Sequence, residues 1–110
     1  ALREMKKLGA IRGPHGYSLP RLGPADEWHL FRHKKVNELL RSSGHADCVL
    51  PAFIGEIGYE GGIDGRKETG WRSYCTAPEF ATFLRAVARK MSLDPDCIGG
   101  TVFLCGAAPV

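Results

Sequence analysis

The sequence predicts an α/β fold in which helices alternate with parallel strands. Segments with helical and with strand periodicity follow one another in the order helix, strand, helix, strand, helix, strand. The last two strand segments are continuous apolar runs, which is typical of strands buried on both faces. Strands that are separated by a helix pair in parallel through right-handed crossovers. The 110 residues are 44% hydrophobic and 25% charged, as expected of one globular domain with a single core.

The first helix and the first strand segment are short. Apolar residues recur at helical spacing over residues 1–8, and Gly9 is a typical residue just after a helix C-terminus. An extended segment is predicted over residues 10–17. A loop rich in proline and glycine follows over residues 18–24.

The second helix and the second strand are longer. The helix is predicted over residues 26–43, where an apolar stripe is flanked by basic residues and Gly44 ends the pattern. The apolar run over residues 49–57 has the length of a strand. A glycine-rich loop is predicted over residues 58–75, and loops of this length within compact domains are usually functional.

The third helix has the clearest start signal in the chain. Thr76-Ala77-Pro78-Glu79 combines a capping-box pattern with a proline in the first turn. From Phe80, apolar residues recur at i, i+3, i+4, i+7, i+8 and i+11, which indicates an amphipathic helix. The Asp94-Pro95 pair ends this region, and residues 98–104 form the last predicted strand.

Two architectures are built from such alternating units, namely the open doubly wound sheet and the (β/α)8 barrel. A barrel takes about 250 residues, so the 110 residues would supply less than half of one. In both architectures the active site forms at the C-terminal ends of the strands.

Glu56 is the strongest candidate for chemistry. It lies at the C-terminal end of the second strand segment, directly before the glycine-rich loop. Strict alternation places it on the same side of the strand as Ala52 and Ile54. Burial of an unpaired carboxylate is costly, so a carboxylate in such a row is either functional or already exposed at the strand end and paired with an arginine. The position alone leaves both interpretations open.

Several short motifs follow one another along the chain in a recognisable order. They are Gly55-Glu56-Ile57-Gly58, Gly70-Trp71-Arg72, Glu79-Phe80-Ala81 with Leu84, Asp94-Pro95 and Gly99-Gly100-Thr101-Val102-Phe103. In this order and spacing they resemble the C-terminal part of the (β/α)8-barrel retaining glycoside hydrolases of the cellulase-like superfamily. The resemblance implies that residues 1–110 are a C-terminal fragment of one TIM-barrel domain. It would comprise the sixth, seventh and eighth strands with the intervening helices.

The resemblance also implies roles for three residues. In this family the seventh strand ends in a Gly-Glu-Ile-Gly type motif whose glutamate is the nucleophile, which here is Glu56. The family's sixth strand carries a His-x-Tyr type segment, which resembles His15-Gly16-Tyr17-Ser18. His15 would bind a sugar hydroxyl and Tyr17 would orient the nucleophile, or both would simply pack a loop. Apart from the resemblance, Trp71 is a candidate for stacking on a sugar, because an aromatic face suits the apolar side of a pyranose. The alternative is a tryptophan that anchors the loop.

The chemistry of a retaining glycosidase needs a second carboxylic acid, about 5–5.5 Å from the nucleophile. In the family this acid follows the fourth strand, which would precede Ala1. Glu60, Asp64 and Glu68 lie in the loop without a motif that marks them for this role. We therefore expect the full-length protein to hydrolyse O-glycosidic bonds of an oligo- or polysaccharide without a cofactor. We expect residues 1–110 alone, without the remainder of the barrel, to be inactive.

Two further functions stay open, a barrel that binds carbohydrate without catalysis and a small doubly wound domain that binds a phosphorylated ligand. The net charge of +3 comes from 15 basic and 12 acidic residues spread along the chain, which argues against a nucleic-acid partner. No apolar run is long enough to cross a bilayer, so no membrane partner is expected.

The histidines and cysteines predict no metal site. The four cysteines contain no C-x-x-C pair. His29 and His33 lack the His-Glu-x-x-His pattern, so we expect an ordinary surface pair. Cys48 and Cys97 each precede a strand, and the spacing of adjacent strands permits a disulfide between them. Free thiols are the alternative that we favour.

Overall fold

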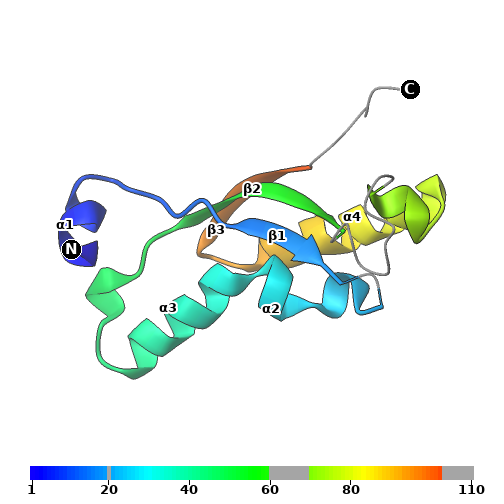
Figure 1. Cartoon of the computed structure of the whole chain (residues 1–110). Coiled ribbons are helices and arrows are strands. Elements are labelled where there is room, and N and C mark those ends of the chain that lie inside the picture. The colour runs from blue at the N-terminus through cyan, green and yellow to red at the C-terminus, as the bar shows by residue number, and fades with distance from the viewer. Residues whose placement is uncertain (20, 60–69, 103–110) are drawn as a thin grey trace.

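The computed structural model describes residues 1–19, 21–59 and 70–102 of the chain (Figure 1). In chain order its α-helices (α), 3-10 helices (η) and strands (β) are α1 (Leu2–Lys7), β1 (His15–Ser18), η1 (Gly23–Ala25), α2 (Glu27–Leu30), α3 (Arg32–Ser42), η2 (Ala46–Cys48), β2 (Ala52–Tyr59), η4 (Gly70–Ser73), α4 (Ala77–Leu93) and β3 (Cys97–Val102). In the part of the chain that is described, no helix combines the length and the apolar character needed to cross a membrane.

The three strands form one parallel sheet in the order β1-β2-β3. The predicted α/β class and the predicted parallel pairing are therefore confirmed. His15 of β1 is aligned with Glu56 of β2. Between Ile54 and Ile57, β2 contains one residue more than the matching segment of β3, so the register shifts there.

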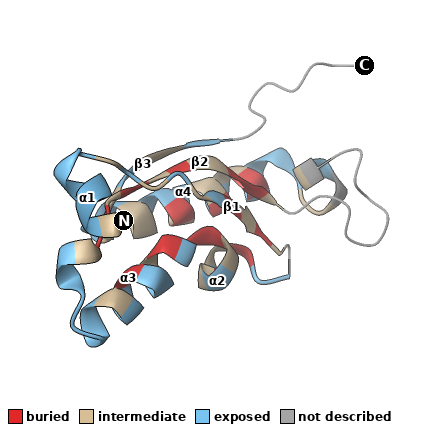
Figure 2. Ribbon diagram, turned by 60° about the vertical axis from the view of Figure 1, so that its left-hand side comes forward, coloured by how far each residue is buried: buried red, intermediate tan, exposed pale blue. Residues whose placement is uncertain are grey.

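The helices α2, α3 and α4 cover one face of the sheet (Figure 1). A single core cluster lies between this face and the helices, and its buried members are Leu30, Phe31, Ile54, Ile57, Phe80, Phe83 and Val87. Figure 2 shows the buried residues where the sheet meets the helices. Within the described ranges no helix covers the opposite side, which we call the open face. A doubly wound sheet carries helices on both faces, so the described part has the one-sided arrangement instead.

The predicted second helix is divided in two. Its start is confirmed, because the side chain of Asp26 accepts a hydrogen bond from the backbone N–H of His29. The helix is interrupted at Phe31, whose φ of −127° and ψ of 46° are not helical. Neighbouring residues on a continuous helix point about 100° apart. The interruption allows Leu30 and Phe31, which are adjacent in sequence, both to enter the core.

The third helix begins where the sequence predicts. The side chain of Thr76 accepts a hydrogen bond from the backbone N–H of Glu79, and Pro78 lies in the first turn. The helix then buries Phe80, Phe83 and Val87 on the face that contacts the sheet.

The strand ends differ from the predicted ones by several residues. β2 continues to Tyr59, so the loop predicted from residue 58 starts later. The Tyr59 ring packs against the rings of Phe80 and Phe83, with centroids 5.6 and 4.4 Å away, and these contacts hold the strand end on α4. Residues 60–69 of that loop and the last two residues of the predicted strand 98–104 lie outside the described part.

Three of the four cysteines are described, and all three are free thiols. They are Cys48, Cys75 and Cys97. The disulfide between Cys48 and Cys97, which the strand spacing permits, is therefore not formed in this structure. Cys105 lies outside the described residues.

Candidate functional site

Glu56 lies on the open face of the sheet, and the prediction that it shares a side with Ala52 and Ile54 is wrong. Ala52 and Ile54 are fully buried, and Ile54 belongs to the core beneath the helices. The extra residue in β2 is a bulge, and a bulge reverses the alternation beyond it. Ile57 consequently points into the helix-covered core, and Glu56 points away from it.

The geometry at Gly55 identifies the position of the bulge. A Cβ atom on Gly55 would lie 3.5 Å from Cδ2 of His15, which is also within reach of the Glu56 carboxylate. Two consecutive positions of β2 therefore point to the same face, as at a β-bulge. The hydroxyl of Thr101 on β3 donates a hydrogen bond to the carbonyl oxygen of Gly55, which ties the bulge to the neighbouring strand.

The carboxylate of Glu56 contacts two side chains of β1. The Tyr17 hydroxyl donates a hydrogen bond to Oε2 of Glu56. Nδ1 of His15 lies 3.4 Å from the same oxygen. His15 and Tyr17 are two residues apart in the strand, so their side chains project from the same face. The structure thus brings together three of the four residues singled out in the sequence.

The Glu56 carboxylate is held in place but is open to solvent. Its side chain is 28% exposed, and that of His15 is 56% exposed. Oε2 is engaged by the two β1 residues, whereas Oε1 accepts no hydrogen bond from any described residue. A partly exposed carboxylate that is fixed through one oxygen is suited to attack an electrophilic carbon or to accept a proton.

A glycine between the two β1 side chains allows β1 to approach α2. A Cβ atom on Gly16 would lie 3.0 Å from the carbonyl oxygen of Leu30 and 3.3 Å from the Ile54 side chain. Any larger residue would push α2 away from the sheet. The His-Gly-Tyr spacing therefore combines two open-face side chains with one close contact on the core face.

The loop after β1 is anchored by a buried carboxylate. Asp26 accepts hydrogen bonds from the backbone N–H of Leu19 at 2.8 Å, and its Oδ1 lies 2.8 Å from Nδ1 of His29. Burial acts to raise the pKa of Asp26, but the hydrogen bonds from Leu19 and His29 outweigh it and lower the pKa. Asp26 therefore stays ionised near neutral pH and fixes the segment that follows Tyr17.

Trp71 lies on the other side of the sheet from Glu56. Its ring stacks on Phe80 of α4, with centroids 4.7 Å apart and planes 3° from parallel. The guanidinium carbon of Arg72 lies 5.3 Å from the centroid of the Trp71 ring. The indole packs against the core cluster on the helix side. This arrangement corresponds to the loop-anchor alternative and does not bring Trp71 to the open-face site.

His29 and His33 are not the surface pair that the sequence predicts. His33 is only 2% exposed, and its Nε2 lies 2.7 Å from Oδ2 of Asp94 in the turn before β3. His29 instead pairs with Asp26. The prediction failed because Phe31 breaks the helix between the two histidines, and the i, i+4 relation holds only in a continuous helix.

The turn before β3 is tied to α3 by a second carboxylate. The guanidinium of Arg41 donates two hydrogen bonds of 2.7 Å to Asp96, and the amide of Asn37 donates one of 3.2 Å. The hydrogen bonds from Arg41 lower the pKa of Asp96 despite its partial burial. Sequence reasoning did not identify this contact, because the partners are more than 50 residues apart.

The lowered pKa of Asp96 leads to a pH-dependent prediction for the Asp96→Asn variant. The folded protein holds Asp96 ionised to lower pH than the unfolded chain does, so its contribution is complete above the unfolded pKa of about 3.9 and is lost as the pH falls through the folded pKa. We expect the variant to lower the free energy of unfolding by about 1–3 kcal/mol at pH 7. Urea titrations at pH 7 and at successively lower pH should show the difference shrinking below about pH 4.

A matched control for this prediction is Glu38→Gln. The Glu38 carboxylate pairs with Lys35 at 3.7 Å, and both side chains are well exposed. Exposed pairs contribute little, so this variant should stay close to the original stability at all pH values. If Asp96→Asn lowered the free energy of unfolding by the same amount at pH 3 and at pH 7, the lowered pKa of Asp96 would be contradicted.

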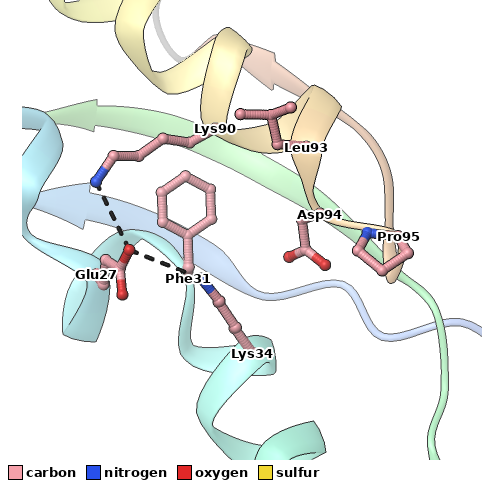
Figure 3. Close-up of a pocket in the computed structure, with 7 residues that line it drawn as sticks. All are labelled: Glu27, Phe31, Lys34, Lys90, Leu93, Asp94 and Pro95. Carbon is pink, nitrogen blue, oxygen red and sulfur yellow. Dashed lines mark ion pairs between the residues drawn. The ribbon is translucent and has the colours of Figure 1, made fainter.

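A pocket of about 200 Å3 lies between the helices, on the side of the sheet opposite to Glu56 (Figure 3). Its lining residues are Glu27, Phe31, Lys34, Lys90, Leu93, Asp94 and Pro95. The carboxylate of Glu27 forms ion pairs with Lys34 at 3.8 Å and Lys90 at 3.6 Å. None of the site residues predicted from the sequence lines this pocket. The negative charge of Glu27 is already compensated by its two lysine partners. We therefore place the candidate site on the open face.

Comparisons of the chain with protein-family models, with curated proteins and with solved structures find no match.

Proposed function

We propose that this chain supplies the last three strands of a (β/α)8 barrel and that the complete barrel is a retaining glycoside hydrolase. Glu56 is the nucleophile of the proposed reaction. The proposal combines the motif order described above with the geometry of the open face. A carbohydrate-binding barrel without catalysis is the alternative that the experiments below distinguish from it.

The sheet supports the barrel part of the proposal. Parallel strands in the order β1-β2-β3 with their helices on one face are the repeating unit of a (β/α)8 barrel. Among the described residues, β1 and β3 each pair with one neighbour only, so further strands can extend the sheet on both sides. In a barrel the face without helices lines the interior, and the open face of this sheet would do so.

A single observation carries the catalytic part of the proposal. The Glu56 carboxylate lies on the open face toward the C-terminal end of β2, fixed by Tyr17 and beside His15. Barrel enzymes place their reactive groups at this end of the strands. The bulge is essential to this arrangement, because strict alternation would turn Glu56 into the helix-covered core.

The proposed reaction has two steps. An oxygen of Glu56 attacks the anomeric carbon, the glycosidic C–O bond breaks, and the leaving oxygen takes a proton from a carboxylic acid elsewhere in the barrel. Water then attacks the anomeric carbon, gives its proton to that same group and releases Glu56 as a carboxylate. Tyr17 keeps the Glu56 side chain oriented in both steps. The family resemblance places this acid after the fourth strand, so we assign it to the remainder of the barrel. Glu60, Asp64 and Glu68 lie outside the described residues.

Covalent labelling tests the proposed nucleophile directly. The full-length protein that carries this chain is incubated with a panel of 2-deoxy-2-fluoro glycosyl fluorides of different sugar configurations. The fluorine slows the second step more than the first, so the glycosyl ester accumulates. We expect a mass increase equal to one fluoroglycosyl group with at least one member of the panel. Peptide mapping should locate the modification on Glu56.

The control for labelling is the Glu56→Gln variant, which preserves the size of the side chain and cannot form the ester. We expect no modification of this variant and none of the isolated residues 1–110. Labelling of a different carboxylate would contradict the role of Glu56. Binding of oligosaccharide without any labelling or hydrolysis would favour the non-catalytic barrel.

A further inference from the structure

The turn that precedes β2 carries three side chains whose donor atoms converge. They belong to His45, Asp47 and Cys48, and their potential ligand atoms all lie within 4.8 Å of one another. The turn is the 3-10 helix η2, which is closed by a hydrogen bond of 2.9 Å from the Cys48 N–H to the His45 carbonyl. A second bond of 2.7 Å, from the His45 N–H to the Leu40 carbonyl, joins the turn to the end of α3. These backbone hydrogen bonds therefore keep the three residues close to one another.

The combination of donor atoms is that of a zinc site. Zinc is bound by imidazole nitrogen, thiolate sulfur and carboxylate oxygen at about 2.0–2.3 Å, usually in a tetrahedron. Magnesium and calcium instead take oxygen ligands. Three protein ligands leave one position of the tetrahedron for water. His45 and Asp47 are exposed and Cys48 is partly exposed, so side-chain rotations can bring the donors to bonding distance of an ion from solvent.

We propose that His45, Asp47 and Cys48 bind a zinc ion, with water as the fourth ligand. The site is separate from the proposed active site, because η2 precedes β2 whereas Glu56 lies toward the other end of that strand. The inference does not depend on the proposed hydrolase. A bound ion would stabilise the folded chain through mass action and would leave the open face unchanged.

Arg3 is the group that opposes the ion. Its guanidinium donates a hydrogen bond from Nε to Oδ2 of Asp47, and the two side chains are 58% and 56% exposed. This cation occupies one carboxylate oxygen and repels a second positive charge. Exposed ion pairs are weak, so zinc can displace the guanidinium. Removal of this charge should consequently strengthen the binding of zinc.

Protection of thiols from alkylation tests the site. Zinc chloride is titrated into the chain in a calorimeter, and parallel samples are treated with iodoacetamide and examined by peptide mass analysis. We expect zinc to slow the modification of Cys48, because a coordinated thiolate is a poor nucleophile. Burial raises the pKa of the Cys75 and Cys97 thiols, so these react slowly and serve as internal references whose rates zinc leaves unchanged. Magnesium chloride should protect no thiol.

Variants separate this site from adventitious binding elsewhere. His45→Ala and Cys48→Ser should each weaken zinc binding by at least about tenfold. Arg3→Gln should strengthen it, and this gain cannot come from a loss of folding. His15→Ala removes an exposed histidine outside the turn and should bind zinc like the original chain. Equal zinc affinity in the Cys48→Ser variant, or no effect of zinc on Cys48 alkylation, would overturn the proposal.

Discussion

Replacement of Glu56 by glutamine is expected to lower kcat/KM for glycoside hydrolysis by about 10^4-fold or more, as for loss of a nucleophile in other enzymes. The amide oxygen can still accept the hydrogen bond from Tyr17, so the packing of the open face is preserved. What is lost is the oxygen that bonds to the anomeric carbon. The measurement uses the full-length protein and the aryl glycoside that it cleaves fastest.

The Tyr17→Phe variant is the matched comparison for Glu56→Gln. It keeps the nucleophile and removes one hydrogen bond to a charged group, worth about 1.5–3 kcal/mol. This corresponds to a loss of about ten- to hundredfold in rate. Loss of the nucleophile is thus expected to lower the rate far more than loss of its positioning residue, although the two residues share one hydrogen bond.

Chemical rescue distinguishes a nucleophile from a residue that only supports the fold. In Glu56→Ala, sodium azide can occupy the space of the lost carboxylate and attack the anomeric carbon of an activated glycoside. The product should be a glycosyl azide of inverted configuration. Hydrolysis by Glu56→Gln at the original rate, or the absence of azide product from a folded Glu56→Ala protein, would rule out the assigned role.

Truncation of Phe83 is expected to cause the largest loss of stability among single changes in the core. Phe83 belongs to α4, is 3% exposed and is part of the core beneath the sheet. Its ring packs on Tyr59 at 4.4 Å and on Phe80 at 5.7 Å between centroids. Phe83→Ala removes these contacts and leaves a cavity, so the free energy of unfolding should fall by about 3–5 kcal/mol.

Urea unfolding monitored by circular dichroism measures this loss. Phe83→Leu is the graded control, because it retains much of the buried volume and should cost clearly less. Leu93→Ala on the same helix is the exposed control, since Leu93 is 72% exposed and leaves the core intact. If Phe83→Ala and Leu93→Ala destabilised the chain equally, the described packing of α4 on the sheet would be wrong.

The sequence predicted parts of the candidate site but not its geometry. Glu56 was found because a carboxylate at the end of an apolar run is unusual, and His15 and Tyr17 because they resemble a motif of the sixth barrel strand. The contact between Tyr17 and Glu56 depends on a strand pairing across 39 positions of the chain. The donors at η2 and its N-cap His45 are close in sequence, but they match neither the C-x-x-C nor the His-Glu-x-x-His pattern.

Two residues show why local patterns were insufficient. Trp71 was a candidate for sugar stacking, and the structure places it on Phe80 instead. His33 was expected at the surface, and it is buried against Asp94 of a turn 61 positions away. In both cases an unpredicted neighbour decides the environment of the side chain. The local sequence pattern around a residue does not indicate which distant residues will contact it.

Local signals in the sequence predicted the order of the helical and strand segments, the start of α4 at Thr76 and the position of Glu56 near the end of a strand, but not the interruption of the second helix at Phe31. These features arise from periodicity, capping and turn residues, which act between neighbours along the chain. The face on which Glu56 lies depends instead on long-range pairing. That face is set by a bulge, and the bulge depends on how β2 pairs with β3 and on the hydrogen bond from Thr101 to Gly55. A shift of one residue in such pairing reverses every side chain beyond it, so alternation alone could not predict this face.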